Sequence, residues 1–323
     1  MKITKIKRLL SLCLCFAFLF ALTACGESGQ KDTYTVGICQ LVQHPALDAA
    51  TEGFKAALKD ALGDKVIFDE KNASNDIPAC ATIANGFVAK GVDLVLANAT
   101  PALEAMAAAT TTIPILGTSV TEYGVALGIE NFSGTVGGNI SGTSDLAPLE
   151  GQANMVKELC PDAKTVSLVY CSAEPNSRYQ VETIKALLEK LGLTATLFPC
   201  SDSNDLAAVT EAACVGADVL YVPTDNTIAN AAQIVDGIAR RVKIPVIAGE
   251  EGICSACGVA TLAISYYDLG YKTGEMAVEI LTGKKKISDM PIEYAPNAVK
   301  KYNAELAAEL GLTVPEDYEK IGG

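Results

Sequence analysis

Two apolar stretches of the sequence end in small polar clusters, and a helix-forming segment follows each cluster. The stretch DLVLANATPALEAMAAA (93–109) breaks at NATP (98–101), and DVLYVPTDNTIANAA (218–232) breaks at PTDN (223–226). In parallel sheets the loops at the carboxyl ends of the strands converge and present amides and helix N-termini to ligands. Hydroxyls and amides suit a carboxylate, whereas Asp and Glu suit an ammonium group. The two clusters therefore predict a cleft for a small molecule.

Further polar loops follow other strand-like runs, at 43–45 and 117–122 in the first half and at 174–177 and 249–251 in the second. Ser144 and Asp145 lie where the chain would cross between the halves. Ser, Thr, Asp and Asn are also the preferred N-caps of helices, so each polar residue taken singly has that structural alternative. The only histidine, His44, is either a surface loop residue or a ligand contact. The prediction of a cleft depends on the whole set.

The sequence lacks the motifs of common enzyme chemistry. It has no GxSxG, no P-loop and no GxGxxG after a first strand, and VGGNISGTS (136–144) is interpreted as a hinge. A single histidine leaves little general acid–base chemistry beyond the carboxylates. We therefore expect a binding protein without catalytic residues.

The elements that must position these loops alternate between short apolar strands and amphipathic helices. YTVGICQL (34–41) precedes a helical pattern in which Ala46, Ala50 and Phe54 share one face, and the alternation continues to IPILGTSV (113–120). This order predicts a parallel sheet with helices on both faces. The second half repeats the unit, since GVDLVLANATP…IPILGTSV matches GADVLYVPTDN…IPVIAGEE. We predict an α/β protein of two similar lobes, with a tail of strand, helix (267–283), strand and a helix from Asn303 that returns to the first lobe.

The first residues have the features of an export signal. Basic residues within 2–8 precede an apolar run over 9–24 that is too short for a comfortable membrane span. LTAC (22–25) is similar to a bacterial lipobox, which implies cleavage before Cys25 and lipidation of its thiol; an ordinary signal peptide is the alternative. A polar tether follows at 25–33. Removal of four basic and no acidic residues would change the formal net charge from −13 to about −17, a surface that repels nucleic acid.

Eight cysteines remain after Cys13, Cys15 and Cys25 are set aside. Several lie in strand-like runs where cysteine acts as a small hydrophobe, so we favour unpaired buried thiols, with disulfides as the alternative. Cys254 and Cys257 have CxxC spacing, and a loop disulfide between them stays open. No second CxxC or His cluster accompanies them, so no metal site is predicted.

Six of these motifs together resemble a known family. GICQLVQHPALDAATEGF, ANATPALEAMA, IPILGTSVTEYGVALG, GGNISGTSDLAP, YVPTDNTIANA and SYYDLGYKTGEMA occur in order and resemble the ABC-transporter substrate-binding lipoproteins of the tryptophan or aromatic amino-acid type. The resemblance covers about residues 34–296. It implies a type I periplasmic-binding-protein fold, with two Rossmann-like lobes joined by a three-stranded hinge. The expected domains are a lipoprotein signal peptide (1–24), the tether (25–33), lobe 1 (34–143 with part of 264–292) and lobe 2 (144–263 with part of 293–323).

The resemblance also implies a ligand set and a mechanism. An amino acid, most simply tryptophan, tyrosine or phenylalanine, would be captured by closure of the two lobes. The expected partners are an ABC permease and its ATPase. We expect the protein to be held at the outer face of the membrane by a lipid on Cys25, and to be a monomer without cofactors. Asp225→Ala is expected to remove binding without unfolding the protein. The ligand-binding positions carried over, with Val120 of the same loop added, are His44, Thr100, Ser119, Val120, Asp145, Asn176, Ser177, Asp225, Asn226 and Glu250.

Two segments depart from the expected pattern, AISYY (263–267) and the cysteine-containing EEGICSACG (250–258). They leave open which amino acid or related ligand binds. A sensory binding protein that feeds a membrane receptor, or uptake of a non-aromatic ligand, is the alternative. Sugar sites usually stack the ring on aromatic residues, and the sequence has no Trp. A LacI-type regulator of the same fold is excluded by the export signal and the missing basic helix-turn-helix.

Overall fold

The computed structural model describes residues 31–295 and 297–322, and from Thr33 onward the chain forms one compact unit. The predicted signal peptide, the predicted lipidation site Cys25 and most of the predicted tether lie outside the described residues. Within the described residues no helix combines the length and the apolar character that a membrane crossing requires.

Six strands form the first sheet, in the order β11-β5-β4-β3-β1-β2, and every neighbouring pair is parallel. Its central strands are buried along almost their whole length, as expected for a parallel sheet covered on both faces. The strands of this sheet are β1 (Tyr34–Gln40), β2 (Val66–Asn72), β3 (Leu94–Asn98), β4 (Ile115–Val120), β5 (Ile140–Ser144) and β11 (Glu293–Tyr294).

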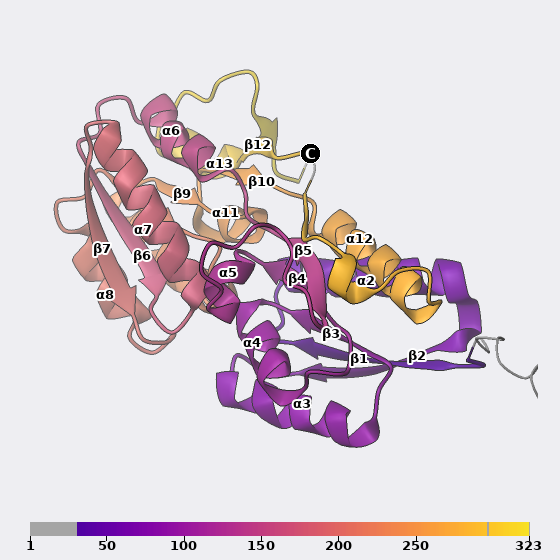
Figure 1. Ribbon diagram of the computed structural model, residues 1–323. Coiled ribbons are helices and arrows are strands. Elements are labelled where there is room, and N and C mark those ends of the chain that lie inside the picture. Colours follow the sequence, from indigo (N-terminus) through magenta and orange to yellow (C-terminus); the bar gives the residue numbers. More distant parts are fainter. Residues whose placement is uncertain (1–30, 296, 323) are drawn as a thin grey trace, which may run out of the picture. The chain divides into compact units, whose positions relative to one another are not determined.

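Helices cover the two faces of the first sheet (Figure 1). Leu94 and Leu96 of β3 pack with the helices α2 and α12, whereas Val95 and Ala97 pack with α3 and α4 on the other face. This alternation follows from the two-residue period of a strand. The helices are α2 (Pro45–Leu62), α3 (Ile77–Lys90), α4 (Thr100–Ala109), the short α5 (Tyr123–Leu127) and α12 (Tyr266–Leu281), with a 3-10 turn η1 (Gly63–Lys65) after α2.

The second sheet has seven strands in the order β13-β12-β10-β9-β8-β6-β7. All its pairs are parallel except β10 with β12. Its strands are β6 (Thr165–Cys171), β7 (Thr194–Cys200), β8 (Val219–Val222), β9 (Val246–Ala248), β10 (Ala260–Ala263), β12 (Val299–Tyr302) and β13 (Glu319–Lys320). Its helices are α6 (Leu149–Leu159), α7 (Pro175–Lys190), α8 (Leu206–Cys214), α9 (Asn226–Asn230), α10 (Ala232–Val242), α11 (Glu251–Cys257) and α13 (Ala304–Glu309); a 3-10 turn η2 (Ile287–Asp289) precedes β11.

Small residues let α12 pack closely on α2 and so return to the first sheet. A Cβ atom added at Gly270 would lie 1.9 Å from the carbonyl oxygen of Ala50, and one added at Gly53 would lie 2.1 Å from that of Tyr267. The backbones therefore approach more closely than any other residue type would allow. The predicted tail that rejoins the first lobe is confirmed by this packing.

The chain passes between the two sheets three times, after β5, after β10 and between β11 and β12. This confirms the predicted α/β fold of two lobes with a three-stranded connection. Two boundaries differ from the expected lobes: Ser144 ends β5, and Glu293 and Tyr294 pair with that strand, so all three belong to the first sheet. The segment interpreted as a hinge contains β5 itself, and the crossing begins at Asp145.

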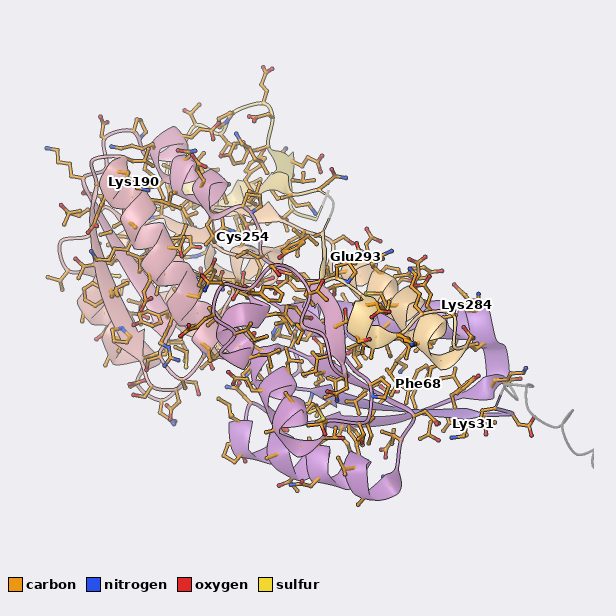
Figure 2. All side chains as sticks on the ribbon, viewed as in Figure 1. Lys31, Phe68, Lys190, Cys254, Lys284 and Glu293 are labelled. Carbon is orange, nitrogen blue, oxygen red and sulfur yellow. The ribbon has the colours of Figure 1, made fainter. Side chains whose placement is uncertain are left out.

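Two helices differ from the sequence-based expectation. The helix-forming segment that follows the polar cluster at 223–226 is broken at Ala231 into α9 and α10. The segment after Glu250, expected as a loop, forms α11, which contains Cys254 and Cys257. All eight cysteines among the described residues are free. Figure 2 shows Cys254 inside the fold, whereas Lys190 and Lys284 project at the surface. The favoured prediction of unpaired thiols is confirmed, although Cys160 and Cys214 are only partly buried.

Candidate functional site

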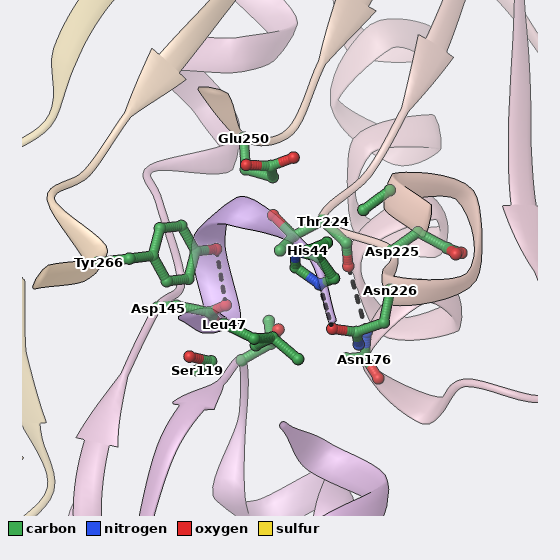
Figure 3. A pocket seen from close by; sticks show the side chains of 12 residues that line it. His44, Leu47, Ser119, Asp145, Asn176, Thr224, Asp225, Asn226, Glu250 and Tyr266 are labelled. Carbon is green, nitrogen blue, oxygen red and sulfur yellow. Dashed lines mark hydrogen bonds between the residues drawn. The ribbon is translucent and has the colours of Figure 1, made fainter. Parts of the chain in front are cut away.

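The carboxyl ends of the strands of both sheets contribute to one cavity (Figure 3). The space between protein atoms there is about 270 Å³, part of it open to solvent. The first sheet contributes residues of β4 and the start of α2, and the second contributes residues that follow β8 and β9. The lining residues are His44, Leu47, Ser119, Thr121, Asp145, Asn176, Thr224, Asp225, Asn226, Ala229, Glu250 and Tyr266.

Seven of the ten predicted ligand-binding residues line this cavity: His44, Ser119, Asp145, Asn176, Asp225, Asn226 and Glu250. Three do not. Thr100 begins α4 and is buried, Val120 packs in the core of the first lobe, and Ser177 is buried within α7, where its hydroxyl accepts a hydrogen bond from Asn176 Nδ2.

The sequence reasoning missed Leu47, Thr121, Thr224, Ala229 and Tyr266 as lining residues. Thr121 and Thr224 lie in the predicted polar loops at 117–122 and 223–226. A prediction that listed every residue of these loops would have contained both. Tyr266 stood in a segment noted only as a departure from the expected pattern. Glu174, in the predicted loop 174–177, lies just behind the cavity and is 1% exposed. No spacing in the sequence distinguishes these residues from their neighbours.

Three lining residues have a buried side-chain oxygen without a hydrogen-bond partner: Ser119 Oγ, Asp145 Oδ1 and Asn176 Oδ1. A buried polar atom left unpaired costs roughly 1–3 kcal/mol. Such atoms are rare in native structures and call for an explanation. Their concentration around one cavity indicates that a ligand supplies the missing hydrogen bonds. Asp145 Oδ1 and Asn176 Oδ1 are acceptors, so that ligand must bring hydrogen-bond donors.

Ser119 is held in a strained backbone conformation. Its φ angle is 54°, in the left-handed region that non-glycine residues avoid. The register between β4 and β5 shifts between Gly117 and Val120, and Ser119 lies inside this irregularity. Bulges of this kind re-aim a side chain, and strain that persists in a native structure gathers at functional sites. The bulge therefore turns the Ser119 hydroxyl toward the cavity instead of leaving it in the sheet.

Asp145 is the carboxylate with a free acceptor. Its Oδ2 accepts a 3.0 Å hydrogen bond from the Tyr266 hydroxyl, whereas its Oδ1 has no partner. Burial raises the pKa of Asp145 to about 6, against the hydrogen bonds that favour the charged form. A bound cation would restore the ordinary preference for the ionised form. Asp145 is therefore suited to hold an ammonium group.

The other two carboxylates of the cavity are committed to helix N-termini. Glu250 caps α11 by accepting hydrogen bonds from the backbone amides of Gly252 and Ile253, and burial raises its pKa to about 7. Asp225 caps α9 through Ile228 N and also accepts from the backbone N–H of Cys171. Burial raises the pKa of Asp225 well above its ordinary value. These side chains shape the cavity wall with little remaining capacity for a ligand.

His44 links the two lobes. Its Nε2 lies 3.2 Å from Asn226 Oδ1, and burial lowers the pKa of the imidazole, so the ring stays neutral near pH 7. No Lys or Arg is among the described residues that line the cavity. The wall thus presents carboxylates, hydroxyls, amides and one neutral imidazole. This combination suits a ligand that carries an ammonium group and no net negative charge.

A metal would need a cluster of ligating side chains. In the part of the chain that the structure describes, no group of three or more His, Cys, Asp or Glu side chains is placed to hold one. The donors of the cavity are therefore interpreted as contacts to an organic ligand.

Comparison with known proteins gives three matches in agreement with this geometry. The family described as ABC transporter substrate binding protein matches residues 35–321. A tyrosine-binding protein from Clostridioides difficile (strain R20291) is 39% identical over 269 residues, which are 82% of this chain and 77% of the relative. An ABC domain from Streptococcus pneumonia in complex with L-Trp is 34% identical, with a TM-score of 0.84 over 88% of this chain and 96% of that chain.

A fourth match indicates the conformation. The ligand-free, open structure of a substrate-binding protein with adhesive properties from Clostridium difficile is 38% identical and covers 90% of this chain and 99% of that chain, but its TM-score is only 0.69. This open structure is more similar to the chain in sequence than the L-Trp complex is, but it is less similar in three-dimensional arrangement. The arrangement of this chain is thus more similar to the L-Trp complex than to the ligand-free, open structure, and His44 and Asn226 are in direct contact.

Proposed function

The chain belongs to the family of ABC transporter substrate-binding proteins, and from this we propose that it captures an aromatic L-amino acid in the cleft between its lobes and delivers it to an ABC importer. The relatives that are more than 30% identical include a tyrosine-binding protein and a complex with L-Trp. The observation that carries the proposal is the set of three unpartnered buried oxygens, of Ser119, Asp145 and Asn176, around one cavity.

The α-ammonium group of the ligand is assigned to Asp145. An ammonium group has three donors, and the two unpartnered acceptors of the cavity are Asp145 Oδ1 and Asn176 Oδ1. A hydrogen bond to a charged group contributes about 1.5–3 kcal/mol. Asp145 would thus be the residue on which affinity depends most strongly.

The α-carboxylate is assigned to Ser119. The Ser119 hydroxyl lines the cavity, has no partner and is free to donate. Leu47, Ala229 and the ring of Tyr266 supply apolar wall for the side chain of the ligand.

The family acts outside the cytoplasm, on small-molecule ligands and together with an ABC transporter. The finer expectations are part of the proposal: the protein is a monomer, releases its ligand chemically unchanged, and is held at the membrane by a lipid on Cys25. Cys25→Ser tests the anchor. The full-length variant is expected to move from the membrane fraction to the soluble fraction, whereas Cys214→Ser, a matched change at a partly buried thiol, leaves the distribution unchanged.

The binding test uses the absence of Trp from the protein. Residues 26–323 are expressed, freed of bound ligand by unfolding and refolding, and titrated with L-tryptophan while the fluorescence of the ligand is followed. Tyrosine, phenylalanine and branched-chain amino acids serve as competitors. Saturable binding that an aromatic amino acid displaces supports the proposal and ranks the ligands. Absence of binding by all aromatic amino acids would contradict it, and mass spectrometry of the co-purifying molecule would then identify the ligand class.

A further inference from the structure

Glu174 is a carboxylate of the second lobe that touches the cleft only through other residues. It precedes α7, is 1% exposed and does not line the cavity. Its two oxygens nevertheless accept five hydrogen bonds. Oε2 accepts from Asn176 Nδ2 at 3.1 Å, from the backbone N–H of Asn226 at 3.1 Å and from Asn226 Nδ2 at 2.7 Å. Oε1 accepts from the backbone N–H and from the hydroxyl of Thr227, both at 2.8 Å.

The contact with Asn226 fixes which end of its amide faces the first lobe. A carboxylate only accepts hydrogen bonds, so the NH₂ group of Asn226 must point to Glu174 and its Oδ1 must point away. That oxygen lies 3.2 Å from His44 Nε2 on the first lobe. His44 is therefore in the tautomer that carries its proton on Nε2. The reversed amide would place two oxygens 2.7 Å apart at Glu174, which charge repulsion forbids.

The contact between Glu174 and Thr227 fixes the direction of a second hydrogen bond between the lobes. The Thr227 hydroxyl donates to Glu174 Oε1, which leaves its lone pairs free. One of them accepts a 3.3 Å hydrogen bond from Nδ2 of Asn75, a residue of the loop between β2 and α3 in the first lobe. At both contacts the second lobe presents an acceptor and the first lobe presents a donor. The carboxylate of Glu174 determines which side donates and which side accepts at both contacts.

We propose that Glu174 is a positioning residue for closure, which orients Asn226 and Thr227 so that they latch onto His44 and Asn75 of the opposite lobe when ligand is enclosed. The inference rests on the proposed capture of an amino acid by lobe closure. It assigns Glu174 a role in the lifetime of the closed complex and no contact with the ligand. Because the latch forms after the ligand has entered, its loss should increase the dissociation rate and leave the association rate almost unchanged.

Glu174→Gln tests the role, because the amide keeps the size of the side chain but turns one of its acceptors into a donor. We expect L-tryptophan to dissociate about tenfold faster, the loss of one hydrogen bond to a charged group, while the association rate changes less than about twofold. Glu189→Gln, on the exposed face of the same helix, is the matched control and is expected to retain both rates.

The single histidine gives a spectroscopic readout that needs no assignment. ¹⁵N chemical shifts of the liganded wild type are expected to show His44 protonated on Nε2. In Glu174→Gln the Asn226 amide is free to turn, and the signal should shift toward the Nδ1-protonated form or average between the two. A variant with lower thermal stability but with the wild-type tautomer and dissociation rate would overturn the proposal, since Glu174 would then be structural only.

A double-mutant cycle with Asn75→Asp isolates the second contact. The introduced carboxylate has no donor for the Thr227 hydroxyl, so dissociation should be several-fold faster when Glu174 is present. In a Glu174→Ala background, which removes both acceptors, the hydroxyl is free to turn and donate to the introduced carboxylate, so the same change should have little effect or a favourable one. Additive effects of the two changes would contradict a shared latch.

Failure of the proposed function is separated from failure of the latch by a measurement on the protein as purified. If the wild type binds no aromatic amino acid, the proposed function fails. The ¹⁵N chemical shifts of His44 then decide the latch in wild type and Glu174→Gln that retain the co-purifying molecule. A proton on Nε2 in the wild type that is lost or averaged in the variant supports the latch, and the same tautomer in both proteins overturns it.

Discussion

Tyr266 donates its phenolic hydrogen to Asp145 Oδ2 across 3.0 Å, and the two residues lie on two different passages between the sheets. Asp145 follows β5 on the first passage, and Tyr266 begins α12 on the second. Both also line the cavity. A ligand that binds Asp145 Oδ1 therefore contacts the connection between the lobes directly. If the ligand binds Asp145 as proposed, this pair would couple ligand recognition to lobe closure without an intervening chain of residues.

Asp145→Asn is expected to weaken binding of L-tryptophan by about 10–100-fold, because the ammonium group loses its charged partner, a contribution of roughly 1.5–3 kcal/mol. The unliganded variant should be at least as stable as the wild type, since a buried carboxyl whose pKa burial raises to about 6 has been removed. Calorimetric titration and thermal unfolding measure the two effects. Tyr266→Phe keeps the carboxylate and should weaken binding less. Unchanged affinity in Asp145→Asn would assign the ammonium group to another residue.

The stability of the unliganded protein should decrease as the pH rises from about 4.5 to about 7. Burial raises the pKa of Glu250 from 4.5 to about 7, so its favourable protonated form is fully present below pH 4.5 and is lost as the pH rises through 7. The raised pKa corresponds to about 3 kcal/mol over this range. Urea unfolding of the wild type and Glu250→Gln at several pH values measures it. The difference in free energy of unfolding between the two proteins reports on Glu250 alone, because Asp145 is present in both. A difference that does not change with pH would contradict the raised pKa of Glu250.

The sequence predicts the fold well because its signals are local. Buried parallel strands appear as apolar runs, and Pro45 and Pro101 mark the starts of helices in the structure as they do in the sequence. Loops at the carboxyl ends of strands could be recognised for the same reason, and seven predicted residues meet in one cavity. The end of the first lobe, in contrast, was expected one residue early, at 143, and 136–144 was interpreted as a hinge, because glycines such as Gly142 are as compatible with a hinge as with a strand.

The residues that were missed depend on tertiary contacts. Tyr266 reaches Asp145, 121 positions away, and Glu174 reaches Asn226, 52 positions away. No period or spacing relates such pairs. Ser119 could be listed from the sequence, but its φ of 54° follows from a register shift between β4 and β5 that only the paired strands reveal. The chemistry of single loops is thus readable from the sequence, whereas the partner of each side chain is not.

Ser119→Gly and Ser119→Ala should separate strain from hydrogen bonding. Both remove the hydroxyl, so both should weaken ligand binding several-fold, about 1 kcal/mol. Only glycine relieves the positive φ, a conformation that costs an L-residue about 1–2 kcal/mol. We therefore expect the alanine variant to unfold at a lower temperature than the glycine variant, although alanine is otherwise the better residue in a strand. Thermal unfolding without ligand measures the difference. Equal midpoints would show that the backbone stores no strain at Ser119.

Asp225→Ala is expected to destabilise the protein, which changes the expectation drawn from the sequence. That expectation counted the loss of one helix cap. In the structure Oδ1 of Asp225 accepts from Ile228 N at 2.9 Å, and Oδ2 accepts from Cys171 N at 2.7 Å. Alanine leaves both buried donors unpaired, at a cost of about 1–3 kcal/mol each. Denaturant unfolding should therefore show a free energy of unfolding lower by several kcal/mol.

Asp225→Ser is the matched comparison, because serine is also a preferred N-cap and can retain the bond to Ile228 N while it loses the bond to Cys171 N. Its destabilisation should be about half that of the alanine variant. Under conditions where both variants are folded, ligand affinity should decrease only a few-fold, since neither carboxylate oxygen is free to bind a ligand. If Asp225→Ala instead unfolds at the wild-type midpoint and loses all binding, Asp225 contacts the ligand directly, and the ammonium group would then be shared between Asp225 and Asp145.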